Sequence, residues 1–224
     1  MKKIFMSPLF MPIVFMIAWL AFMAGVYFLY PNDILNITKE GGVVEDITHF
    51  GYVVLIAVLI IRSDDFSDRV KTWATLFFLT MCAFLREQGI QHHLSQTDTT
   101  PFKSRFFLNP NNPISEKIIF GTVLLIVAGA VIYLAIKYSK HLVRSFFQFN
   151  PVTWSIAVLC TVGVCAKLVD RFPSNWRKAH NGVPLPEQTY AICQLLEESS
   201  EMFLPYIAVG ALYQFKLQKQ GWNA

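Results

Sequence analysis

The residues best suited to chemistry are three glutamates in a stretch that is otherwise apolar. Glu197, Glu198 and Glu201 lie within little more than one turn of the helix expected over residues 190–215. An acidic side chain at the centre of a membrane-spanning helix costs roughly 2.5 to 3.5 kcal/mol to insert. Three such groups together need partners, protonation, a bound cation or water. We therefore predict a functional site here, with the three glutamates as candidate catalytic residues.

Histidines and a further carboxylate predict a metal site at the same depth. His49 lies near the start of the second apolar stretch, whereas Glu87, His92 and His93 follow the third. Neutral imidazole together with carboxylates is a donor set that suits Zn, Mn or Fe. Such an ion lowers the pKa of a bound water toward ~7, and a remaining glutamate such as Glu197 could then act as general base. This donor set predicts a divalent metal cofactor.

Four charged residues at the same ends of the expected helices are candidate substrate-binding residues: Arg86, Lys117, Asp170 and Arg171. A lysine or arginine there could receive the phosphate of a lipid. Alternatively, the basic residues neutralise the acidic ones and form salt bridges between helices. His92 and His93 could equally be solvated loop residues.

The side chains must be positioned by a bundle of membrane-spanning helices. Of the 224 residues, 54% are hydrophobic and only 15% are charged, which is too apolar for an ordinary soluble domain. Six stretches approach or reach the ~20 apolar residues that span a ~30 Å hydrocarbon layer. They are Leu9–Tyr30, Asp46–Ile61, Thr72–Leu85, Ile118–Tyr138, Val152–Val169 and Tyr190–Phe215. We predict an all-α polytopic bundle of six transmembrane helices, forming a single integral membrane domain over residues 1–224.

The loop charges predict the orientation of this bundle. The side of the N-terminus carries ten basic and three acidic residues, and the opposite side carries nine basic and twelve acidic ones. The positive-inside rule therefore places both termini in the cytoplasm and the candidate site at the exoplasmic side. The short loops and the start Met1-Lys2-Lys3 suit a bacterial inner (plasma) membrane. Residues 171–189 contain three prolines and Asn181-Gly182, a pattern that predicts turns and extended chain.

Three classes of function remain open from the sequence. The first is a metal-dependent membrane hydrolase that acts on a lipid or lipid-linked substrate. The second is a non-enzymatic membrane scaffold or sensor, and the third is a proton- or cation-coupled transporter. The expected partner is membrane lipid, and the oligomeric state is left open. No basic run or aromatic platform indicates a nucleic-acid partner. The sequence also lacks a His-Glu-x-x-His motif, and we find no convincing internal repeat.

Overall fold

The computed structural model describes residues 2–39, 41–90 and 104–221, and all regular elements within these ranges are helical. The predicted all-α class is therefore confirmed for the described residues. The helices are α1 (Lys2–Phe5), α2 (Phe10–Leu29), α3 (Ile34–Thr38), α4 (Val43–Ile61), the 3-10 helix η1 (Ser63–Arg69), α5 (Val70–Glu87), α7 (Ser104–Leu108), α8 (Ile114–Phe147), α9 (Pro151–Ala179) and α10 (Glu187–Lys219). Each of the six predicted stretches falls mainly within one long helix, namely α2, α4, α5, α8, α9 and α10.

Four segments of the described chain are long and apolar enough to cross a membrane. They are Phe10–Leu29, Ile34–Ile61, Ile114–Phe147 and Pro151–Ala179. These helices are the signature of an integral membrane protein, because ~20 apolar residues in helical form span the hydrocarbon layer. α5 and α10 are not among the segments that meet this criterion of length and composition. The six spans and the cytoplasmic termini stay predictions.

The chain forms two compact units. The first consists of Met1–Val58 and Arg144–Ala224, and the second consists of Leu59–Val143. α4 and α8 each contribute residues to both units. The prediction of a single membrane domain is not tested by this division, because one membrane bundle can contain more than one compact unit.

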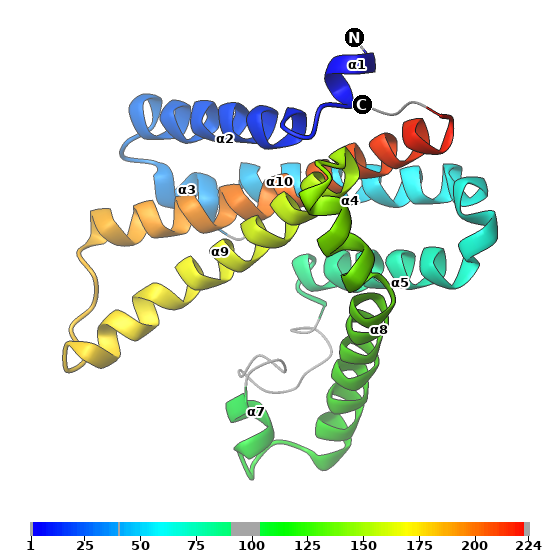
Figure 1. Ribbon diagram of the computed structural model, residues 1–224. Coiled ribbons are helices and arrows are strands. Elements are labelled where there is room, and N and C mark those ends of the chain that lie inside the picture. The colour runs from blue at the N-terminus through cyan, green and yellow to red at the C-terminus, as the bar shows by residue number, and fades with distance from the viewer. Residues whose placement is uncertain (1, 40, 91–103, 222–224) are drawn as a thin grey trace. The chain divides into compact units, whose positions relative to one another are not determined.

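In the first unit α10 is the central helix. It packs against α9, α2 and α3 (Figure 1). Its buried residues recur every three or four positions over most of its length: Ala191, Leu195, Ser199, Met202, Pro205, Ile207, Ala211, Gln214 and Leu217. This spacing brings one broad face of the helix against its neighbours. Buried apolar side chains of α2, α3 and α9 complete the core against this face.

The connection between α9 and α10 is shorter than the sequence predicts. α9 continues through Pro173 to Ala179, so residues 171–179, predicted as turns and extended chain, are helical. An interior proline removes one backbone hydrogen bond and is most easily accommodated near a helix end. α9 has 29 residues and α10 has 33. At 1.5 Å per residue they are about 44 and 50 Å long, and both exceed the ~30 Å hydrocarbon layer. Figure 1 shows the two helices diverging toward the segment that joins them.

The second unit contains η1, α5, α7 and most of α8. The indole Nε1 of Trp73 donates a hydrogen bond to the carbonyl of Leu59 at 2.8 Å, which ties the start of α5 to the end of α4. Near the start of α8, the amide of Asn112 donates to the carbonyl of Phe106 at 2.8 Å. The Phe106 ring is fully buried and packs edge-on against Phe120. Hydrogen bonds from side chain to backbone therefore connect α5 to α4 and connect the turn before α8 to α7.

The contact between α4 and α10 gives a stability prediction. A Cβ added at Gly51 would lie 2.7 Å from Cγ of Pro205 and 2.8 Å from the Tyr206 ring, whereas a Cβ at Gly25 of α2 meets nothing within 4 Å. We expect Gly51→Ala to lower the free energy of unfolding by about 1 to 3 kcal/mol through overpacking. Gly25→Ala should be neutral or raise it by up to ~1 kcal/mol, since alanine favours helix. Denaturation of both variants in detergent checks this, and an unchanged Gly51→Ala protein would contradict the close packing.

Candidate functional site

The three predicted catalytic glutamates all lie on α10, and two of them face α9. Glu197 and Glu201 are four residues apart and therefore share one side of the helix. Their side chains are largely buried, with 20% of Glu197 and 10% of Glu201 exposed. Glu198 is half-buried on an adjoining side of the same helix. α10 therefore carries all three carboxylates inside the first unit, as the sequence predicts, although their chemical role is not tested by their position.

Lys167 of α9 is the residue around which the carboxylates gather. Its Nζ lies 2.6 Å from Oε1 of Glu201 and 4.0 Å from Oε1 of Glu197. On its own helix, Oδ2 of Asp170 lies 3.9 Å from the same nitrogen. One ammonium is therefore shared by three carboxylates from two helices. We name Lys167, Asp170, Glu197 and Glu201 the ion cluster.

The bond between Lys167 and Glu201 is the strongest contact of the ion cluster. A separation of 2.6 Å is that of a short charge-assisted hydrogen bond, which is about twice as strong as a neutral one. Pro205 lies inside α10 four residues beyond Glu201. It has no N–H, so the backbone carbonyl of Glu201 lacks its usual helical donor. The Glu201 side chain is therefore bound to Lys167 at a residue whose backbone carbonyl lacks its helical hydrogen bond.

Two other polar residues of α10 bind α2 and α4. Trp19 Nε1 donates to Oγ of Ser199 at 3.0 Å, and this serine is completely buried. The hydroxyl of Tyr206 donates to the carbonyl of Ile47 at 2.9 Å. A polar group in an apolar surrounding is stable only when it is hydrogen-bonded. These bonds fix the rotation of α10 relative to α2 and α4.

Near its end, α10 is held by Gln214, which is completely buried. Its Oε1 accepts a hydrogen bond from Ser155 of α9 at 2.6 Å, and its Nε2 donates to the carbonyl of Phe5 in α1 at 2.9 Å. Sequence reasoning missed Ser155, Ser199 and Gln214. The available signal was a polar residue at a position of the buried stripe, spaced three or four residues from apolar neighbours.

Of the predicted metal ligands, His49 belongs to the first unit and Glu87 to the second. His49 Nε2 lies 3.5 Å from Oε1 of Glu45, a residue of its own helix one turn earlier. The other oxygen of Glu45 accepts a hydrogen bond from the backbone N–H of Gly41, so this carboxylate also caps the start of α4. Within residues 2–39, 41–90 and 104–221 no three His, Cys, Asp or Glu side chains are grouped so that they could hold a metal ion.

The remaining predicted ligands are Glu87, His92 and His93. Glu87 belongs to the second unit, where its Oε1 lies 3.6 Å from Nη1 of Arg86. His92 and His93 lie outside the described residues. The metal site that joins these three residues with His49 stays a prediction.

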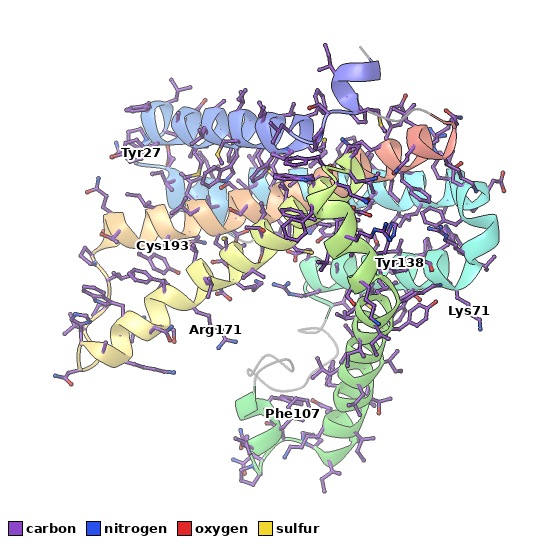
Figure 2. The ribbon with its side chains drawn as sticks, viewed as in Figure 1. Tyr27, Lys71, Phe107, Tyr138, Arg171 and Cys193 are labelled. Carbon is purple, nitrogen blue, oxygen red and sulfur yellow. The ribbon has the colours of Figure 1, made fainter. Side chains whose placement is uncertain are left out.

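The four predicted substrate-binding residues have different surroundings. Asp170 belongs to the ion cluster, and Arg171 is exposed on α9 (Figure 2). In the second unit, Lys117 Nζ donates to the carbonyl of Asn109 at 2.6 Å and thereby closes the turn before α8. Arg86 pairs with its neighbour in sequence. Of the predicted site residues, the structure thus brings Asp170, Glu197 and Glu201 together around Lys167, which was not among the predicted site residues.

Comparison with known proteins gives no match: no protein-family model, no curated protein and no solved structure corresponds to this chain. The function must therefore be inferred from the residues and their geometry.

The ion cluster predicts that replacing Lys167 lowers the free energy of unfolding more than replacing Glu201 does. In Lys167→Met the buried Glu201 carboxylate loses the ammonium that lies 2.6 Å from it, and removing one member of a buried ion pair costs up to about 3 to 5 kcal/mol. Lys167 is 43% exposed, so its long side chain can turn away when Glu201 is replaced. We expect Lys167→Met to lower the free energy of unfolding by about 2 kcal/mol, and Glu201→Gln by less than about 1 kcal/mol.

The measurement is denaturant unfolding in detergent of both single variants and of the double variant. The double variant should be more stable than Lys167→Met alone, because the glutamine at position 201 carries no charge that the missing ammonium would have to balance. Additive effects of the two substitutions would show that the pair is not coupled.

Proposed function

We propose that the protein is a multi-pass membrane scaffold or sensor in which the polar residues of α10 hold the helices together. The observation that carries the proposal is the 2.6 Å contact between Lys167 and Glu201, which joins the most buried carboxylate of the cluster to a neighbouring helix. The bonds of Ser199, Tyr206 and Gln214 extend the same pattern to α1, α2, α4 and α9.

The composition of the helices supports this arrangement in a membrane. α2, α4, α8 and α9 expose many large apolar side chains, as helices in contact with lipid do. α10 carries the polar groups and is covered by its neighbours, which suits the helix at the centre of a bundle. We propose that α5 and α10 are the two further spans, that both termini are cytoplasmic and that the host is a bacterial inner membrane.

A charge exchange tests the structural role. When Lys167→Glu is combined with Glu201→Lys, the pair still has one positive and one negative charge. The negative charge is then on α9 and the positive charge on α10. We expect this double variant to regain most of the thermal stability that Lys167→Glu alone loses, because a structural pair needs complementary charge and not a particular residue at each position. Thermal unfolding of the full-length protein in detergent measures this. No recovery in the exchanged variant would contradict a purely structural pair.

Metal analysis separates this function from a metal-dependent hydrolase acting on a lipid or lipid-linked substrate. The hydrolase hypothesis combines His49, Glu87, His92 and His93 as ligands with a glutamate of α10 as general base. It would give stoichiometric Zn, Mn or Fe in the purified protein, and loss of lipid hydrolysis after chelation. The scaffold predicts no stoichiometric transition metal and the same thermal stability with and without chelator.

One observation favours a proton- or cation-coupled transporter as a second candidate. Three carboxylates lie within 4.0 Å of the Lys167 ammonium in the ion cluster, so several acidic groups are crowded at one point. Crowded carboxylates readily exchange protons or cations. Transport predicts cation or proton flux into proteoliposomes that Glu197→Gln abolishes, whereas Glu187→Gln, at the exposed start of α10, serves as the matched control. Absence of flux in the unaltered protein would exclude this candidate.

A further inference from the structure

A second polar cluster joins α5 to α8 within the second unit. Nζ of Lys137 donates hydrogen bonds to Oγ1 of Thr72 at 2.9 Å and to the hydroxyl of Tyr133 at 2.8 Å. The hydroxyls of Thr72 and Tyr138 lie 2.6 Å apart. The same ammonium is 5.2 and 5.4 Å from the ring centroids of Tyr133 and Tyr138, which are cation–π distances. The exposed Lys137 is thus held in a defined position by two phenols and a buried threonine.

This cluster lies where the apolar part of each helix ends. Lys137 directly follows the apolar run 118–136 of α8, and Lys71 and Thr72 precede the apolar run of α5. The hydrogen bonds at Thr72 bring the end of the apolar run of α8 next to the start of the apolar run of α5. Figure 2 labels Tyr138 on α8 and Lys71 near the start of α5. Tyrosine and lysine at such a boundary are typical of the level of lipid headgroups.

The charge at this end of the second unit is positive. Its basic residues are Arg62, Arg69, Lys71, Lys137 and Lys140, and its acidic residues are the aspartates at 64, 65 and 68. Five positive charges against three negative ones leave an excess of two. Lys71 is exposed and directly precedes Thr72, whose hydroxyl binds Lys137. A negatively charged ligand would therefore meet at least two cations beside hydroxyl donors.

We propose that Lys71, Lys137, Tyr133 and Tyr138 form a binding site for the phosphate of an anionic phospholipid headgroup. Lysine binds phosphate as a mobile point charge, and phenol hydroxyls can donate further hydrogen bonds to its oxygens. Two of the three N–H donors of Lys137 bind Thr72 and Tyr133, and the third serves the ligand. The acyl chains of the lipid lie along the exposed apolar side chains of α8, such as Ile132 and Ile136.

The position of the site indicates whether the bound phosphate belongs to a lipid or to a free anion. The loops at this end of α5 and α8 belong to the side that the charge pattern assigns to the cytoplasm. The cytoplasmic leaflet carries a negative surface potential, and each basic residue near it contributes on the order of 1 kcal/mol to the attraction. The phosphate is therefore that of a lipid in the same membrane and not a free anion.

The test is lipid binding to the purified full-length protein in detergent, measured by native mass spectrometry with phosphatidylglycerol and phosphatidylcholine. We expect preferential binding of phosphatidylglycerol, about fivefold weaker in Lys71→Gln and in Lys137→Gln. Tyr133→Phe should weaken it less, because it removes a hydroxyl but no charge. Lys178→Gln, an exposed lysine at the end of α9, is the matched control and should bind as the unaltered protein does.

Three results would overturn the proposal. Equal binding of the two lipids by the unaltered protein would show that charge is not recognised. An equal loss in Lys178→Gln would show a general effect of net charge. Displacement of phosphatidylglycerol by millimolar inorganic phosphate would identify a free-anion site instead of a lipid site. Thermal unfolding of each variant without lipid shows whether it is folded. If Lys137→Gln does not fold, Lys137→Arg takes its place. This variant keeps the charge and should retain the preference for phosphatidylglycerol.

Discussion

The bond between Lys167 and Glu201 is the constraint on which the arrangement of the first unit depends. A carboxylate that is nine-tenths buried within a membrane protein is stable only beside a positive charge, a donor or a proton. Lys167 supplies the charge from α9 and thereby fixes both the depth and the rotation of α10 relative to that helix. Once the rotation is fixed, Ser199 faces Trp19, Tyr206 reaches Ile47, and the buried apolar stripe meets α2 and α3.

The distribution of polarity differs from that of a soluble bundle. Within the first unit, α2 and α9 expose large apolar side chains and pack against α10, which carries glutamates, serines and a glutamine. Lipid provides no hydrogen bonds, so these polar side chains must find partners within the bundle. They do so with different neighbours: α9 through Lys167 and Ser155, α2 through Trp19, and α4 through Ile47. A single polar helix therefore connects most of the first unit.

Local sequence signals were reliable where they concern helix formation and less so at helix ends. All six long helices follow from apolar length, because backbone hydrogen bonds of a buried segment must close within it. Pro173 was read as part of a loop, yet α9 continues through it to Ala179. The second predicted stretch begins at Asp46, yet α4 begins at Val43 and the Glu45 carboxylate caps it through Gly41. In both cases the outcome depends on where a helix begins or ends, and the neighbouring residues in the sequence do not decide this alone.

The sequence by itself determined that the chain is helical and suited to a membrane, and that Glu197, Glu198 and Glu201 lie together on one helix. Apolar length and the 3.6-residue repeat fix these properties locally. Only the tertiary structure decided that Lys167 binds Glu201, that Gln214 meets Ser155, and that Lys137 of α8 binds Thr72 of α5. The physical reason is that these contacts depend on the crossing and rotation of helices, which are set by the packing of many side chains at once.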